Sequence, residues 1–260
     1  MSKNEKILTI ITVVKNDKEN ILNTINSVLK QSTKNFEYII FDGNSTDGTS
    51  EIIKSLKSKK IKYFRKKDLN LYDAINRSVT FAKGKYIGLL HSGDIFIDKN
   101  HLKKIIKILR KEPDIISGNL AFYRKYQKKI LTARVWRYLL TKFNQNSVFK
   151  IPHPSVYVKK KLIKKVNYYN IKYNISSDLD FLIKLSRIKN LKFLYIDNFF
   201  LLMKNKGLST NKLSLFLKIR EDLMILYKNY SIFFFIIYFY KIFIKIPSFL
   251  NLKRKIIRLN

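Results

Sequence analysis

Apolar residues along the first half of the chain follow two alternating patterns, one typical of strands and one of helices. The run Ile7–Val14 is rich in β-branched residues and free of charge, which is typical of a strand buried on both faces of a sheet. In the segment 21–29 the apolar residues recur every three or four positions, which predicts a helix. The same two patterns predict further strands at 36–41, 61–65, 86–90, 115–117 and 155–158, and further helices at 52–56, 71–82, 99–111 and 178–188.

Short connections between these elements favour an α/β fold, in which a mostly parallel sheet carries helices on both faces. Ligands of such sheets bind beyond the carboxyl ends of the strands. Asn16 is expected to cap the first helix, with Glu19 in the capping-box position. Three polar clusters fall at predicted strand ends, and we expect them to meet at one site: Thr12–Asn16, Asp42–Asp47 and His91–Asp94.

Composition narrows the class of protein. Of the 260 residues 46% are hydrophobic, which is enough for one large α/β domain. The absence of cysteine excludes disulfides, thiolate metal sites and cysteine nucleophiles. The apolar run near the N-terminus is too short and too polar for a secretory signal, so we expect the protein to stay on the cytoplasmic side.

The chain is strongly basic, with 53 Lys and Arg against 18 Asp and Glu and a net charge of +35. Such an excess attracts nucleic acid or an anionic lipid surface, but an AT-rich coding sequence produces the same bias. The basic residues are spread along the chain without zinc-finger spacing, an RNP-like motif or basic-region heptads, so no nucleic-acid partner is expected. The first strand is not followed by Gly-x-Gly-x-x-Gly, which argues against a dinucleotide-dependent oxidoreductase.

Candidate chemistry depends on carboxylates that follow predicted strands or open a predicted helix. Asp42 could accept the imide N–H of a uracil ring, although an ordinary Asp/Gly-rich turn gives the same pattern. Asp94 could hold a hard divalent cation beside a diphosphate leaving group, or be a plain turn residue. Asp178 or Asp180 could deprotonate an acceptor hydroxyl, or cap the helix that begins there.

Together these segments resemble the family 2 inverting glycosyltransferases of the GT-A fold, and in particular the branch acting in bacterial exopolysaccharide, O-antigen and capsule assembly. Asp42–Thr49 is similar to the family's Asp-Gly-x-Ser-Thr-Asp-Gly-Thr signature. His91–Asp94 is similar to its Asn-Ser-Gly-Asp, although many members carry a full Asp-x-Asp there and this chain keeps Asp94 alone. The other similar segments are Thr9–Asn16, Asp68 with Leu71–Asn76, Ala82–Ile87, His153 with Ser155, Asp178 with Asp180, and Lys206–Ser209.

The resemblance implies an inverting transfer of a sugar from a nucleotide donor, with UDP favoured, to a hydroxyl of a growing glycan. Asp178 would be the catalytic base, with Asp180 next in line, and His153 would lie near donor or acceptor. Asp94 would bind Mg²⁺ or Mn²⁺ together with the diphosphate. Thr12 and Val14 would lie along the base and Asp42 would bond it, and the other implied donor contacts are Asn16, Asp73, Asn76, His91 and Ser92.

The expected organisation is a GT-A domain over residues 1–212 and a basic, aromatic-rich, amphipathic helical tail over 213–260. Within the domain, 1–117 would bind the nucleotide sugar and 118–212 would form the acceptor side. The uncharged run Asn229–Tyr240 is about half the roughly 20 residues that span a bilayer. Basic residues follow this run, which favours a helix in the interface of an anionic membrane over one packed on the domain.

The expected location is therefore peripheral, on the inner face of the cytoplasmic membrane. The expected partners are a nucleotide-sugar donor and a glycan or polyprenyl-diphosphate-linked acceptor. A catalytically inactive scaffold and a polyanion-binding protein stay open as alternatives, and the oligomeric state is not predicted.

Overall fold

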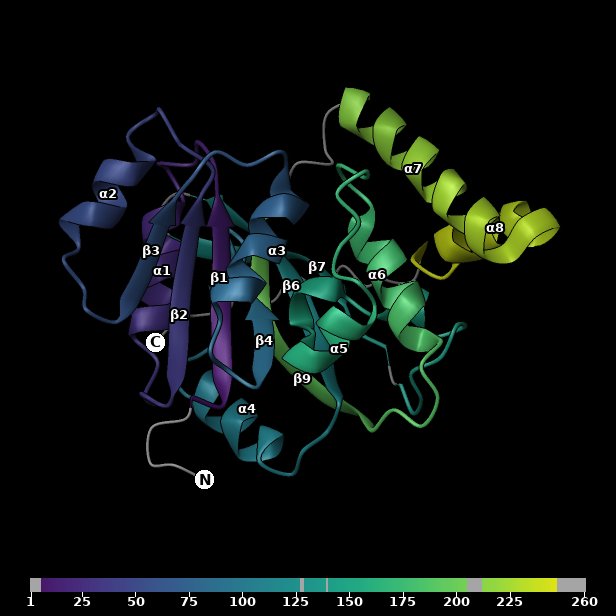
Figure 1. Cartoon of the computed structure of the whole chain (residues 1–260), viewed down its shortest axis with the longest axis horizontal. Helices are drawn as coiled ribbons and strands as arrows, with labels where there is room; N and C mark the ends of the chain where they lie inside the picture. The colour runs from purple at the N-terminus through teal and green to yellow at the C-terminus, as the bar shows by residue number, and fades with distance from the viewer. Residues whose placement is uncertain (1–5, 127–128, 139, 205–211, 247–260) are drawn as a thin grey trace.

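The computed structural model describes residues 6–126, 129–138, 140–204 and 212–246, and a single mixed sheet forms its centre (Figure 1). The sheet has nine strands in the order β3-β2-β1-β4-β8-β6-β9-β5, with β7 paired to β6. The strands are β1 (Leu8–Val14), β2 (Phe36–Asp42), β3 (Ile61–Arg65), β4 (Tyr86–Leu89), β5 (Ile95–Phe96), β6 (Ile115–Tyr126), β7 (Lys129–Trp136), β8 (Tyr157–Lys159) and β9 (Phe193–Lys204).

Helices cover both faces of this sheet. They are α1 (Ile21–Leu29), α2 (Thr49–Ser55), α3 (Leu71–Phe81), α4 (His101–Leu109), α5 (Lys160–Lys165), α6 (Ser177–Ser186), α7 (Lys212–Tyr230) and α8 (Phe234–Phe243), with short 3₁₀ turns η1 (Val148–Lys150), η2 (His153–Ser155) and η4 (Ser231–Phe233). Because side chains of a strand point alternately to its two faces, β1 contributes to two separate cores. Ile11 and Val13 pack with α3, α5 and α6, whereas Leu8 and Ile10 pack with α1, α2 and α4.

The first four strands run parallel, which brings their carboxyl ends to one edge. Val14 pairs with Asp42 and Asp42 with Arg65, so the ends of β1, β2 and β3 lie side by side. β8 then joins β4 in the antiparallel sense, and β6 is antiparallel to β8 but parallel to β9. The predicted α/β architecture, with helices on both faces, is confirmed.

Several elements differ from those expected. The segment 118–150 lacks a clear period in sequence, yet β6 continues to Tyr126 and pairs with β7. The strand β9 is likewise absent from the sequence-based set. The capping role of Asn16 is wrong: α1 begins at Ile21 behind Asn20, and Asn16 adopts a left-handed backbone conformation with φ 53° in the preceding loop.

The C-terminal helices form a hairpin-like unit beside the sheet, since α7 and α8 are joined by η4 and contact each other directly (Figure 1). By length and composition alone, the helical stretch Leu213–Phe243, with 31 residues and an 18-residue window whose mean hydropathy is 1.4, is apolar enough to cross a membrane. The turn at η4 divides this stretch in two, however, and Tyr227 packs edge-on against Phe234 across the turn.

Candidate active site

The three polar clusters predicted at strand ends do meet, through hydrogen bonds between their loops. Asn16 donates its backbone N–H to the Ser45 hydroxyl (2.9 Å), and its side-chain oxygen accepts the N–H of Thr46 (2.8 Å). Asp17 accepts a hydrogen bond from the hydroxyl of Ser92 at 2.6 Å. The β1–α1 loop therefore bridges the loops that follow β2 and β4.

Two residues expected to touch the nucleotide base are buried inside the sheet instead. Thr12 has no exposed surface, and its hydroxyl donates to the Leu90 carbonyl at 2.7 Å. Val14 is 5% exposed and packs in the core on the α1 side. The Thr12 side chain faces the core and bonds β1 to the carbonyl just past β4, and its contact with a nucleotide stays a prediction. These side chains hold the edge of the site in place.

Asp42 is also fully buried, and its carboxylate is engaged within the protein. Oδ1 accepts the N–H of Ser45 (2.8 Å), while Oδ2 accepts the hydroxyls of Ser50 (2.5 Å) and Tyr63 (2.7 Å). Burial raises the pKa of Asp42, but these hydrogen bonds outweigh it and hold the pKa below its usual range. A base N–H could reach Asp42 only by displacing one of these partners, so its role in base binding stays a prediction.

A second carboxylate, Asp68, lies over the backbone of Gly43, next to Asp42. A Cβ built on Gly43 would lie 2.2 Å from Asp68 Oδ2, so only glycine leaves room for this side chain. The Asp68 side chain is 6% exposed and pairs with Lys15 at 3.5 Å. Burial raises the pKa of Asp68, and Lys15 opposes that rise. Asp68 thus offers a carboxylate at the edge of the sheet without the internal hydroxyl partners of Asp42. Asp68 was not among the site residues predicted from the sequence, because the approach of its side chain to Gly43 depends on the fold.

Asp94 lies just past β4 and is 3% exposed. Its Oδ1 accepts the N–H of Lys204 in β9 at 3.1 Å, whereas Oδ2 is buried without a hydrogen-bond partner. Burial raises the pKa of Asp94 to about 8, and the neighbouring Asp17 carboxylate adds to the rise. A buried carboxylate oxygen that lacks a hydrogen-bond partner is a suitable ligand for a metal cation. The cation binds the ionised carboxylate and so displaces its proton.

Asp94 nevertheless offers few companions for a metal ion. Among the described residues, no group of three or more His, Cys, Asp and Glu side chains is arranged so that it could hold a metal ion by itself. The free Oδ2 of Asp94 fits one ligand position of Mg²⁺ or Mn²⁺, and oxygens from a bound diphosphate would have to supply others. This agrees with the expectation that the metal binds together with the nucleotide.

Asp178 and Asp180 lie in the first turn of α6, two residues apart, and point to different sides. Asp180 is 1% exposed and pairs with Lys184 at 2.6 Å. Asp178 is partly exposed. Asp180 is therefore the weaker candidate for the catalytic base, because it faces the core and pairs with Lys184 of its own helix, and its catalytic role stays a prediction. Asp178 alone faces outward.

The charge of the Asp178 carboxylate affects the pKa of two histidines, His91 and His153. Burial lowers the pKa of His91 to about 4, His153 adds to the decrease, and the Asp178 carboxylate opposes it. His91 stays partly exposed, whereas His153 is 8% exposed. Burial likewise lowers the pKa of His153, again opposed by Asp178. The structure thus brings together His91 after β4, His153 in η2 and Asp178 in α6.

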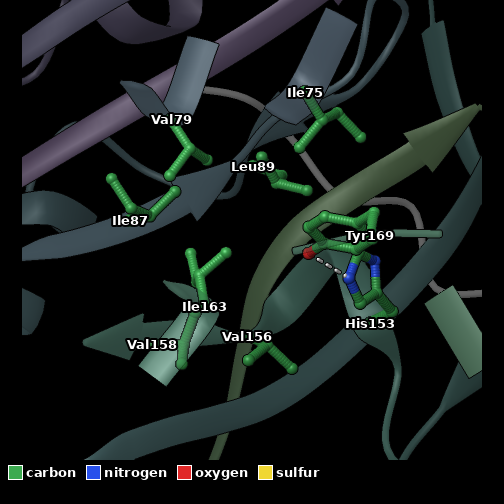
Figure 2. Close-up of a pocket in the computed structure, with 9 residues that line it drawn as sticks. All are labelled: Ile75, Val79, Ile87, Leu89, His153, Val156, Val158, Ile163 and Tyr169. Atoms are coloured by element: carbon green, nitrogen blue, oxygen red, sulfur yellow. Dashed lines mark hydrogen bonds between the residues drawn. The ribbon is translucent and has the colours of Figure 1, made fainter. Parts of the chain in front are cut away.

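His153 reaches this place as part of an aromatic cluster. Its Nε2 is 2.8 Å from the hydroxyl of Tyr169, and its ring packs edge-on against Phe181. Figure 2 shows His153 and Tyr169 at one end of a small cavity otherwise lined by aliphatic side chains from α3, β4, α5, β8 and the residue just before β8. Such a cavity is too small and too apolar for a sugar nucleotide. His153 therefore packs against Phe181, which lies in the same helix as Asp178.

Asp73 and Asn76, both in α3, are engaged by neighbours. Asp73 accepts the N–H of Leu69 (3.1 Å) and pairs with Arg77 (3.3 Å). The side-chain amide of Asn76 donates to the carbonyl of Tyr169 (2.8 Å) and accepts its N–H (3.0 Å). Their roles as donor contacts stay predictions, and Asn76 fixes the loop that carries Tyr169. The segment Lys206–Ser209 lies outside the described residues.

Comparison with solved structures shows the GT-A arrangement. S. aureus TarS, residues 1–349 in complex with UDP-GlcNAc, superposes with a TM-score of 0.64 at 16% identity, over 86% of this chain and 67% of that one. The mannosyltransferase PcManGT from Pyrobaculum calidifontis, in complex with GDP-Man and Mn²⁺, gives 0.59 at 11% identity, over 86% and 63%.

The sequence relatives are named as glycosyltransferases. An uncharacterized glycosyltransferase of Rickettsia conorii is 35% identical over 126 residues, which is 48% of this chain and 20% of the relative. A PGL/p-HBAD biosynthesis glycosyltransferase of Mycobacterium tuberculosis is 25% identical over 167 residues, 62% of each chain. The chain thus spans a fifth or less of the rickettsial relatives and under two thirds of the mycobacterial one. The sequence model of glycosyl transferase family 2 matches residues 9–170, well over half of the chain, and the protein therefore belongs to this family.

Proposed function

We propose that this protein transfers a sugar, with inversion, from a UDP-linked donor to a hydroxyl of a growing cell-surface glycan. The observation that carries the proposal is the partly exposed carboxylate of Asp178 in the first turn of α6, whose charge acts on both His91 and His153. Family membership supports the reaction class. The UDP-GlcNAc bound to TarS supports a uridine nucleotide, although PcManGT is seen with GDP-Man.

In this reaction a single carboxylate acts as the general base. Asp178 accepts the proton of the acceptor hydroxyl while the acceptor oxygen forms a bond to the anomeric carbon of the sugar. The bond from that carbon to the diphosphate breaks on the opposite side, and the nucleoside diphosphate leaves with the electron pair. Asp180 takes no part, since Lys184 holds it in the core.

The leaving diphosphate carries concentrated negative charge near Asp94. A divalent ion bound with the donor would offset this charge, and Asp94 Oδ2 would hold one of its ligand positions. The Mn²⁺ in the PcManGT complex supports this part of the proposal. The low pKa of His91 keeps its ring neutral near pH 7, so its nitrogens serve as hydrogen-bonding groups beside the donor.

We further propose that the acceptor is lipid-linked and that the enzyme works at the inner face of the cytoplasmic membrane. Large apolar side chains stay exposed along both C-terminal helices, among them Phe216 in α7 and Phe235 and Phe239 in α8. Exposed apolar side chains in this number favour an interaction site on these helices. Lys228 of α7 is exposed and suits an anionic membrane interface, whereas Lys241 of α8 is buried and paired with Asp222.

The substitution Asp178→Asn tests the proposed base. It should lower turnover of the donor at least a thousandfold, because the amide cannot accept the proton, while UDP still raises the melting temperature as in the wild type. Asp180→Asn is the matched control on the same helix and should keep turnover within a few fold. Wild-type turnover in Asp178→Asn would refute the proposal.

A further inference from the structure

The loop that leads into α6 is held from two sides. On the α3 side, Tyr72 donates its hydroxyl to the Ile175 carbonyl at 2.6 Å. On the other side, the loop rests against α7, the first helix of the segment that the sequence assigned to a separate tail. Asp178 is the second residue of α6, so the placement of this loop sets where its carboxylate points.

A single carboxylate on α7, that of Glu221, binds three successive backbone N–H groups of this loop. Oε1 accepts the N–H of Asn174 at 2.7 Å, and Oε2 accepts those of Ile175 and Ser176, each at 2.9 Å. Glu221 is 6% exposed, and the Ser176 side chain makes no capping bond to the helix. A negative charge at the N-terminus of a helix is favourable, and hydrogen bonds to an ionised acceptor are stronger than neutral ones.

Neighbouring charges on α7 reinforce the same contact. Lys218 lies 3.5 Å from the Ser176 hydroxyl and pairs with Asp222 at 3.4 Å. Burial would lower the pKa of Lys218, but the carboxylates of Asp222 and Asp178 raise it above its usual value. Asp222 also pairs with Lys241 of α8. The chain of contacts therefore runs from α8 through α7 to the turn that carries Asp178.

We propose that Glu221 is a positioning residue for catalysis: it fixes residues 174–176 and thereby the direction in which Asp178 faces the acceptor. The inference depends on the proposed function, since Asp178 must be the base. It makes α7 part of the catalytic unit. A role confined to stability would be served by any buried contact of α7, whereas three N–H groups converging on one carboxylate fix the orientation of the loop.

The test uses the full chain with Glu221→Gln. Glutamine keeps the size of the side chain but turns an NH₂ group toward backbone donors, so the loop loses part of its anchor. We expect kcat to fall at least tenfold, with the donor KM and the UDP-induced melting shift within twofold of wild type. The rate is expressed per UDP-binding site, so that partial unfolding does not count as lost catalysis.

The matched control is Ile225→Val, which loosens a fully buried position of the same helix without touching the loop. It should lower the melting temperature yet keep kcat within threefold. If Glu221→Gln does not fold, Glu221→Asp replaces it, because the shorter carboxylate keeps the charge but cannot reach all three N–H groups; the same loss of kcat is expected.

The outcomes separate the two proposals. If Asp178→Asn keeps its turnover, the proposed base is wrong and the role of Glu221 falls with it. If Asp178→Asn is inactive while Glu221→Gln keeps kcat, or loses no more than Ile225→Val, the proposed function stands and the positioning role is overturned. A tenfold loss of kcat in Glu221→Gln alone, at unchanged donor KM, supports the proposal.

Discussion

The buried carboxyl of Asp94 makes the stability of this protein depend on pH in a direction opposite to that of most acidic groups. Its pKa lies at about 8 in the folded chain, raised by burial. The folded state therefore binds a proton that the unfolded state has lost across the range between the two pKa values. Below about pH 4 the Asp94 carboxyl is protonated in both states and does not destabilise the folded chain. The free energy of unfolding then falls as the pH rises from 4 toward 8.

The size of the effect follows from the two pKa values. Each tenfold change in proton affinity is worth about 1.4 kcal/mol. With a pKa of 3.8 when hydrated and about 8 when folded, the free energy of unfolding should fall by up to roughly 4 kcal/mol between pH 5 and pH 8. That is a large part of the stability of an ordinary domain. Asp94→Asn removes the titration, at a pH-independent cost of about 1–3 kcal/mol for the amide left unpaired.

The assay is urea unfolding followed by the fluorescence of the single tryptophan, Trp136, at pH 5, 6, 7 and 8 without metal or nucleotide. The readout is the difference in pH slope between wild type and Asp94→Asn, because other charges titrate equally in both. Mn²⁺ with UDP should reduce the slope of the wild type alone, since metal binding stabilises the ionised carboxylate. If the free energy of unfolding changed with pH by the same slope in the two proteins, the conclusion that Asp94 is buried with an unpaired Oδ2 would be refuted.

Two further predictions concern the edge of the sheet and the C-terminal helices. Asp68→Asn should weaken UDP binding about 10- to 100-fold, the effect of about 1.5–3 kcal/mol expected for one charged hydrogen bond to the base; unchanged affinity by isothermal calorimetry would leave Asp42 as the better candidate. Replacing Phe235 and Phe239 by serine should reduce co-sedimentation with phosphatidylglycerol vesicles at least tenfold, because each buried Phe contributes about 1.5–3 kcal/mol. Vesicle binding equal to wild type would remove the apolar surface from the membrane proposal.

The parallel half of the fold was predictable because its strands are buried on both faces. Such strands read as uninterrupted apolar runs, as in Ile7–Val14, and short connections to periodic helices then fix the topology. Of the remaining strands, β8 and the start of β6 were predicted, at 155–158 and 115–117, but the rest of β6 and the strands β5, β7 and β9 were not. β6, β7 and β9 mix aromatic, basic and polar residues, since parts of these strands are exposed and their pairing joins distant segments such as 115–123 with 193–204.

The site was predictable as a location but not as a set of contacts. The polar clusters at strand ends do meet, yet Thr12 and Asp42 point into the protein while Asp68 reaches over Gly43. Sequence spacing places Asp178 and Asp180 on different sides of α6, but cannot tell which side is the core. Nothing in the sequence indicates the role of Glu221, because the groups that it binds are backbone N–H groups nearly fifty residues away along the chain.

The register of β9 has a consequence for the order in which the chain folds. During synthesis β1 to β4 can pair as soon as they emerge, since their connections are short, whereas β9 supplies its residues last and must find β6 some 78 positions upstream. The backbone N–H of Lys204, which donates a hydrogen bond to Asp94, is part of this strand and is synthesised with it. We therefore expect Asp94 to stay hydrated and ionised in a nascent chain, and to enter its low-dielectric setting only when the last strand closes the sheet.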